Sequence, residues 1–295
     1  MSPTDDQLVF NIVWTGTVFP YLRLFTDSLI DHSGARFRFV ANGCPADQVA
    51  LLDDAARASG GRIVEVLVVS TDAMLRHGDA LDIVRARRDD GEYFCLMDPD
   101  ILATGPFLPE FHELLVDHEV VTSGTEVWSD DNVVPAGHPG VAGEHFFDRD
   151  GYVFGSPHMA VYRAGPLAET TARWGVGFGS GGAGLSDKAR SQLAAAEREF
   201  LLYDTGKIVN ILLQEDGFRL RHHDHPALVH IGGMAHYLSP PAYVEGEGGE
   251  PEPDWSEWRG MEARYAVARY TAGLLRELSA GRPAPPVPEL SLIHI

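Results

Sequence analysis

The stretch Tyr93-Phe94-Cys95-Leu96-Met97-Asp98-Pro99-Asp100-Ile101-Leu102 runs from an apolar segment directly into two aspartates separated by one residue. A short apolar run of this kind is typical of a buried β-strand. In open α/β folds, ligands bind beyond the carboxyl ends of the strands, where paired carboxylates can hold a hard divalent cation. The stretch therefore predicts an α/β fold with a metal-bound phosphate at the edge of its sheet.

Strand-like and helix-like segments alternate ahead of this stretch. Period-two or apolar runs predict strands over residues 8–14, 37–43 and 62–69. Amphipathic runs predict helices over 21–29, 45–59 and 73–88. Alternation at this spacing is typical of a mainly parallel central sheet flanked by helices, with right-handed crossovers.

The rest of the chain is less regular. We expect strands over 120–123, 157–163 and 227–231, and helices over 111–117, 193–202, 207–216 and 255–279. Asp204 or Thr205 could cap the helix that begins at 207. We assign the Gly-, Pro- and Asp-rich residues 126–151 to acceptor-side loops. The glycine-rich residues 175–184 suit either a lid or a surface linker.

This organisation predicts one catalytic domain with an extension. The domain is expected over residues 1–239, an acidic linker over 240–253, and a C-terminal helix with a proline-rich tail over 254–295. Trp255, Trp258 and Tyr265 could cover an acceptor cleft, contact a second subunit in a homodimer, or dock the helix on the core. We expect docking.

Composition excludes several classes of function. The formal charge of -20 argues against a protein that coats nucleic acid or docks on anionic lipid, because both need clustered cations. No apolar run approaches the ~18–20 residues of a membrane span, and the N-terminus has no signal-like apolar core. We expect a soluble cytoplasmic protein in which Cys44 and Cys95 are buried thiols rather than a disulfide or a zinc site.

A histidine far downstream supplies a third candidate metal ligand. His230 ends another apolar strand and is followed, after Ile231, by Gly232 and Gly233, which let a ligand approach the backbone. Two carboxylates and one imidazole suit Mn²⁺, or Mg²⁺ with retained waters, better than structural zinc. Asp98, Asp100 and His230 are therefore the predicted metal ligands, the alternative for His230 being a hydrogen-bonded strand-end histidine.

Taken together, Asp98-Pro99-Asp100 and His230-Ile231-Gly232-Gly233-Met234-Ala235-His236 resemble motifs of the GT-A nucleotide-sugar glycosyltransferases. The pattern is most similar to the retaining glycogenin-like and lipopolysaccharide-galactosyltransferase-like members, whose late His-x-x-Gly-x-x-Lys motif supplies a metal ligand and a lysine on the diphosphate. His230 and Gly233 match that motif, whereas His236 stands at the lysine position.

The resemblance covers about residues 8–238 and implies a GT-A, Rossmann-like fold. It also implies a UDP-sugar donor, Mn²⁺ or Mg²⁺, and a small-molecule or saccharide acceptor. By the same analogy, the donor contacts the following residues: Trp14, Thr15, Gly16, Asn42, Met97, Asp98, Gly233 and His236. Arg85, Arg87 or Arg88 could pair with the diphosphate, since a guanidinium fork suits phosphate oxygens. The alternative for each arginine is a solvated helix face.

The stereochemistry decides which catalytic residues are needed. If the anomeric configuration is retained, the donor's own phosphate can assist the acceptor hydroxyl, and no strong protein base is required. Inversion needs a carboxylate base, for which Asp204 and Asp187 are candidates, and His158 could face the acceptor. Helix capping, a solvated loop and a core histidine are the respective alternatives. We favour retention, on the motif at His230.

Three other functions compete with this hypothesis. In a haloacid-dehalogenase-like phosphatase Asp98 would be the nucleophile, but such enzymes carry their motif on the first strand, with Thr or Val where Leu102 stands. A sugar-nucleotide pyrophosphorylase would open with a glycine-rich phosphate loop, which Trp14-Thr15-Gly16-Thr17 does not resemble. A non-catalytic nucleotide-sugar-binding module would be expected to have lost a metal ligand.

Overall fold

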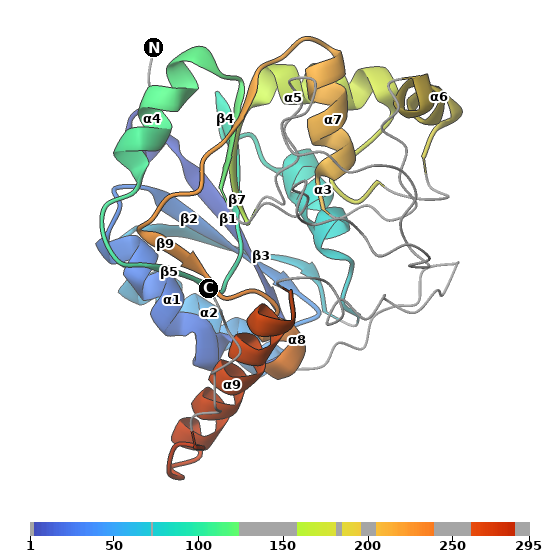
Figure 1. Ribbon diagram of the computed structural model, residues 1–295. Helices are drawn as coiled ribbons and strands as arrows, with labels where there is room; N and C mark the ends of the chain where they lie inside the picture. Colours follow the sequence, from blue (N-terminus) through green and yellow to red (C-terminus); the bar gives the residue numbers. More distant parts are fainter. Residues whose placement is uncertain are drawn as a thin grey trace.

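A seven-stranded sheet flanked by helices forms the centre of the molecule in the computed structural model (Figure 1). The structure describes residues 3–71, 73–123, 158–180, 185–195, 205–238 and 261–286, without the side chains of 236, 237 and 261–266. The strand order is β3-β2-β1-β4-β7-β6-β8, and β7 alone runs antiparallel to its neighbours. The predicted α/β fold with a mainly parallel central sheet is confirmed.

The strands of this sheet have the following bounds: β1 Val9–Thr15, β2 Arg36–Asn42, β3 Ile63–Ser70, β4 Tyr93–Met97, β6 Val120–Ser123, β7 Met159–Arg163 and β8 Leu220–His222. A separate two-stranded ribbon pairs β5 (Ile101–Ala103) with β9 (Leu228–His230). Neither β5 nor β8 was predicted from the sequence, because each is defined by pairing with a strand far away in the chain, which local periodicity does not record.

Helices cover both faces of the sheet. One apolar cluster packs the sheet against helices α1 (Phe19–Asp31), α2 (Ala46–Ala58), α4 (Leu108–Asp117), α8 (Met234–Leu238) and α9 (Met261–Ser279). A second cluster packs the other face against α3 (His77–Arg87), α5 (Ala164–Trp174), α6 (Asp187–Ala195) and α7 (Lys207–Glu215). A short 3-10 helix, Asp5–Gln7, precedes β1. The result is a three-layer sandwich.

Helix α3 begins at His77, whereas the sequence predicted a helix from residue 73. Asn42, at the end of β2, uses the backbone of Leu75 on both sides: its Nδ2 donates to the Leu75 carbonyl and its Oδ1 accepts the Leu75 N–H, each at 2.8 Å. These backbone groups are thereby unavailable to a helix. Arg76 before α3 is extended, with φ -58° and ψ 148°.

The cap predicted for α7 is wrong. Its N-cap residue is Gly206, in the left-handed region at φ 76° and without a side-chain cap hydrogen bond, and Asp204 lies outside the described residues. The described part of the glycine-rich segment, 175–180, is held against α3, because the N–H groups of Phe178 and Gly179 donate to Asp82 at 2.9 and 3.0 Å. Residues 126–151, assigned to acceptor-side loops, lie outside the described part of the chain.

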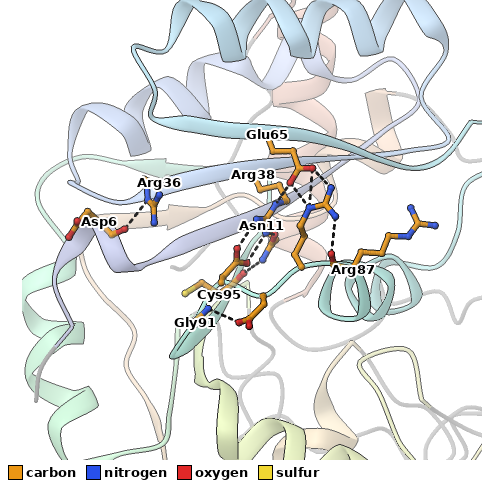
Figure 2. Close-up of polar contacts among 11 residues, drawn as sticks. Asp6, Asn11, Arg36, Arg38, Glu65, Arg87, Gly91 and Cys95 are labelled. Atoms are coloured by element: carbon orange, nitrogen blue, oxygen red, sulfur yellow. Dashed lines mark hydrogen bonds and ion pairs between the residues drawn. The ribbon is translucent and has the colours of Figure 1, made fainter.

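A buried polar network crosses the edge where the parallel strands begin (Figure 2). Arg38 of β2 donates to Asp90 through both Nη atoms at 2.7 Å, to Asn11 at 2.9 Å and to Glu65 at 2.9 Å. Arg88 also pairs with Glu65. The network ties β1, β2 and β3 to the segment that leads into β4, so it stabilises the edge opposite Asp98.

Two further predictions bear on the nature of the chain. Cys44 and Cys95 are free and buried, as expected, and burial raises the pKa of the Cys44 thiol to about 11. Among the helices of the described ranges, none combines the length and apolar character needed to cross a membrane.

Candidate metal and donor site

The two aspartates of the opening stretch lie where one strand ends and the next begins. Strand β4 ends at Met97, and β5 begins at Ile101, directly after Asp100. Ile101 pairs with His230 in the antiparallel β5–β9 ribbon, which brings the histidine beside both carboxylates. His230 Nε2 is 3.2 Å from Asp100 Oδ1 and 3.4 Å from Asp98 Oδ2. The structure thus brings the three predicted metal ligands together.

His158 joins the same cluster. It precedes β7, whose antiparallel pairing with β4 sets Met159 opposite Met97, and its carbonyl accepts the Asp98 N–H at 2.7 Å. The side chain places Nδ1 3.5 Å from Asp98 Oδ2. Its ring stacks on that of His230, with centroids 3.5 Å apart and an interplanar angle of 29°. The histidine considered for the acceptor side therefore lies against the proposed metal ligands.

His77 is a site residue that the sequence analysis missed. It opens α3, and its Nε2 is 3.9 Å from Asp98 Oδ1, the oxygen that faces away from the stacked pair. A crossover helix starts at the edge of the sheet where the parallel strands end. The first residue of α3, His77, could therefore have been expected at the site. The predicted helix start at residue 73 placed it inside the helix instead.

Asp100 and its surroundings orient His230. The Asp100 side chain is buried, and its Oδ2 accepts the Met234 N–H at 3.1 Å. Gly232 and Gly233 both have positive φ, 78° and 69°. A Cβ at Gly232 would lie 3.2 Å from Cε1 of His230. The first of the two glycines thus leaves room for the imidazole itself.

The cluster strongly couples the charges of its members. Burial works to raise the pKa of Asp98, but the neighbouring His158 and His230 outweigh it and hold that pKa far below its ordinary value. Burial works to lower the pKa of His230, but the carboxylates of Asp100 and Asp98 raise it to about 9. Burial, together with the charge on His230, lowers the pKa of His158.

Unpartnered nitrogens indicate that this cluster can accept a ligand. Within the described residues, Nε2 of His158 and Nδ1 of His230 are buried without a hydrogen bond, whereas His230 Nε2 faces the carboxylate oxygens of Asp100 and Asp98. Buried polar atoms normally have partners, so each such group calls for an explanation. Asp98, His158 and His230 offer ligand atoms within 4.8 Å of one another, and Asp100 Oδ1 adjoins them. This donor set fits a divalent cation.

The residues expected to bind the nucleotide have varied positions. Trp14 is fully buried, with its ring edge-on to Phe19 and Phe39, so its indole belongs to the core. Thr15 ends β1, and Gly16 follows in a turn with φ 49°. Met97 is buried in the same core cluster. Asn42 is engaged with Leu75, as described above, and so fixes the segment that leads to His77.

The arginines considered for the diphosphate lie away from Asp98. Helix α3 starts beside Asp98 with His77 and ends with Arg87, a length of about 16 Å at 1.5 Å per residue. Arg88 pairs with Glu65 near the start of β3, Arg87 donates to the Val68 carbonyl at 3.4 Å, and Arg85 donates to Thr171 of α5 at 3.0 Å. The structure does not bring these arginines to the metal cluster.

The remaining candidates are also separate from the cluster or undescribed. Asp187 is an exposed residue at the start of α6, which Figure 1 draws at the upper right, well apart from β5 and β9. Asp204, Trp255 and Trp258 lie outside the described residues, and the side chains of His236 and Tyr265 are not described.

Comparisons with known proteins find similarity in structure only. No protein-family model matches the chain, and no relative is found among curated proteins. Similar solved structures include S. aureus TarS 1–349 in complex with UDP-GlcNAc, at a TM-score of 0.39 and 17% identity over 55% of this chain and 47% of that one. The chain thus spans about half the length of that protein.

Two other similar structures are glycosyltransferases by name. The galactosyltransferase LgtC, in complex with donor and acceptor sugar analogues, has a TM-score of 0.44 and 12% identity over 73% of each chain. The glycosyltransferase GlyE of Streptococcus pneumoniae TIGR4 has a TM-score of 0.43 and 11% identity over 96% of this chain and 66% of that one. Because the identities and TM-scores are low, these structures do not by themselves identify a function for this chain.

Proposed function

We propose that the chain is a metal-dependent glycosyltransferase of the GT-A type, which moves a sugar from a nucleoside-diphosphate sugar, with UDP as the expected nucleotide, to an acceptor hydroxyl. The observation that carries the proposal is the convergence of Asp98, Asp100 and His230 at the carboxyl end of β4. These residues would hold Mn²⁺ or Mg²⁺.

The chemistry of the transfer explains this set of residues. When bound, a divalent cation neutralises the negative charge that develops on the leaving nucleoside diphosphate. Without a cation, Asp98 and Asp100 would repel an anionic donor, and so would a chain with a formal charge of -20. The β5–β9 ribbon and the hydrogen bond from Met234 to Asp100 fix the ligands before the donor arrives, which lowers the cost of ordering them.

We further propose that the reaction retains the anomeric configuration. Of the two aspartates considered as bases, Asp187 lies on α6, apart from the ribbon (Figure 1), and Asp204 is outside the described residues. Asp98 and Asp100 face His230 and are engaged in the cluster. Support comes from His230 and Gly233, which match the His-x-x-Gly pattern of the retaining members, and a retaining reaction requires no strong protein base on the acceptor.

Calorimetry with UDP and a panel of UDP-sugars, with and without Mn²⁺, tests the proposal. We expect UDP to bind more tightly with Mn²⁺, and Asp100→Asn or His230→Ala to remove the metal-dependent part while the circular dichroism spectrum stays unchanged. Asp117→Asn, at an exposed position that ends α4, is the control and should behave as wild type. The proposal fails if no nucleoside diphosphate binds more tightly with metal, and analysis of the product anomer decides between retention and inversion.

A further inference from the structure

His158 occupies a position that neither a core histidine nor an acceptor-side base would require. Its side chain is only 14% exposed, and its Nδ1 points at the same Asp98 oxygen, Oδ2, that faces His230 Nε2, at 3.5 and 3.4 Å respectively. Its ring stacks on that of His230. Two imidazole nitrogens, one from the residue before β7 and one from the end of β9, thus converge on one carboxylate oxygen.

The hydrogen bonding of the two rings sets them apart from ordinary buried histidines. A core histidine normally donates from one ring nitrogen and accepts at the other. In the described part of the chain, His158 Nε2 and His230 Nδ1 are buried without a hydrogen bond, and the other nitrogen of each ring faces Asp98 Oδ2. A shared cation would satisfy a nitrogen of each ring at once, since neutral imidazole coordinates a metal through a nitrogen lone pair.

The backbone makes the placement of His158 a fixed feature of the fold. Its carbonyl accepts the Asp98 N–H at 2.7 Å, and the adjoining Met159 is paired with Met97 in the sheet. The imidazole is therefore positioned by the same two strands that position the first aspartate, as an arrangement of metal ligands requires.

We propose that His158 is a ligand of the same cation as Asp98 and His230, and that this two-imidazole set selects a first-row transition cation over Mg²⁺. The inference rests on the proposed function, which requires a divalent metal, and it restricts which metal the site prefers. Mg²⁺ prefers oxygen ligands and gives up its waters reluctantly, whereas the affinity of nitrogen ligands for first-row divalent cations rises from Mn²⁺ through Co²⁺ toward the later metals. Each nitrogen in the set thus favours Mn²⁺, Co²⁺ or Zn²⁺ relative to Mg²⁺.

The test uses the full-length protein and Mn²⁺ as the probe. Electron spin echo envelope modulation of bound Mn²⁺ should show nitrogen couplings from two imidazoles in the wild type and from one in His158→Phe, which keeps an aromatic ring against His230. Calorimetry should show that His158→Phe weakens Mn²⁺ binding at least about tenfold. Loss of a residue that merely hydrogen-bonds to a metal ligand typically weakens metal binding by about that factor or more, and loss of a ligand should cost no less. His158→Phe should also lower the ratio of the Mg²⁺ to the Mn²⁺ dissociation constant.

Controls separate this inference from the proposed function. His118→Phe makes the same replacement at the end of α4, outside the cluster, and should leave Mn²⁺ binding unchanged. Nitrogen coupling from a single imidazole in the wild type would overturn the role of His158 and leave the metal-dependent function standing. That measurement needs no variant, so it decides the matter even if His158→Phe does not fold. Absence of binding of both Mn²⁺ and Mg²⁺ by the wild type would overturn both.

Discussion

Ile101 lies directly opposite His230 across the antiparallel β5–β9 ribbon, so the residue that follows the second aspartate is the register partner of the candidate metal histidine. The Ile231 N–H also donates to the Asp100 carbonyl at 3.2 Å. Two motifs far apart in the sequence are thereby joined by backbone contacts, and the distance between their side chains follows from the pairing register.

A substitution at Gly232 tests whether the orientation of the His230 ring depends on the space beside it. Gly232→Ala puts a Cβ 3.2 Å from Cε1 of His230 at a φ of +78°, whereas Gly217→Ala introduces the same strain at +86° with nothing within 4 Å. Both variants should lose about 1 kcal/mol of unfolding free energy from the left-handed backbone. Only Gly232→Ala should also weaken Mn²⁺ binding, by roughly 10- to 100-fold, as changes that reorient a ligand do.

Calorimetry of the two glycine variants, with thermal unfolding on the same samples, measures both effects. Equal Mn²⁺ affinities in Gly232→Ala and Gly217→Ala would show that the imidazole tolerates the added methyl group, and that the contact with Gly232 does not position it.

Glu65 provides a prediction about pH. Hydrogen bonds from Arg88, together with those from Arg38, outweigh burial and lower the pKa of Glu65 below its ordinary value of 4.5. A carboxylate with a depressed pKa in the folded state contributes stability above its unfolded pKa and loses it as the pH falls through the folded value. Glu65→Gln should therefore cost about 1–2 kcal/mol at pH 7 and flatten the decline of stability below about pH 5.

Urea unfolding at a series of pH values from neutral to acid measures this difference. Glu113→Gln removes an exposed glutamate of α4 and should keep the wild-type slope. If Glu65→Gln showed the full wild-type decline, the network in Figure 2 would not be the source of the acid sensitivity.

The sequence predicts three residues of the candidate metal site, and it does so for one common reason. Asp98, Asp100 and His230 are detectable because the two aspartates come within three residues of the end of an apolar strand and the histidine ends another, which places them at a sheet edge. His158 is brought to them by the antiparallel pairing of β7 with β4, a long-range choice that local periodicity does not record. The same is true of β5, whose partner lies more than a hundred residues away.

The positions of the arginines follow from the direction of helix α3, which connects β3 to β4. A helix that connects two parallel strands must run back along the sheet, so its last residues lie where the strands begin. Arg85 and Arg88 stand at the end of such a helix, and the structure pairs them with Thr171 and Glu65. His77 stands at its start, beside Asp98.

Asn42 lies at the end of β2, at the sheet edge where the nucleotide was expected, but its side chain contacts the backbone of Leu75. Its amide makes two hydrogen bonds of 2.8 Å with the backbone of Leu75, ahead of His77. Asn42→Ala leaves the Leu75 N–H and carbonyl without these partners, at a cost of about 1–3 kcal/mol if they remain buried. Native-state hydrogen exchange should show loss of protection at the Leu75 amide, with the amides of β6 as an internal reference. Unchanged protection at Leu75 would contradict the anchoring role.

Asp82 determines whether the start of the glycine-rich segment is held to the body of the protein. Its carboxylate accepts the N–H groups of Phe178 and Gly179, and the Phe178 ring packs against Phe94 at a centroid distance of 5.4 Å. Asp82→Ala removes the acceptor for both N–H groups, each of which costs about 1–3 kcal/mol when left buried and unpaired. We expect lower stability and faster proteolysis within residues 175–180.

Asp79→Ala is the matched control for Asp82→Ala. It lies three residues earlier on α3 and is also beside Gly179, but among the described residues its carboxylate pairs with the exposed side chain of Arg76 and not with an N–H group of the segment. Surface ion pairs contribute about 0–1 kcal/mol, so Asp79→Ala should retain near-wild-type stability and resist proteolysis in the 175–180 segment. Limited proteolysis with mass-spectrometric mapping distinguishes the two variants. If both are cleaved equally, the packing of Phe178 rather than the carboxylate of Asp82 holds the segment.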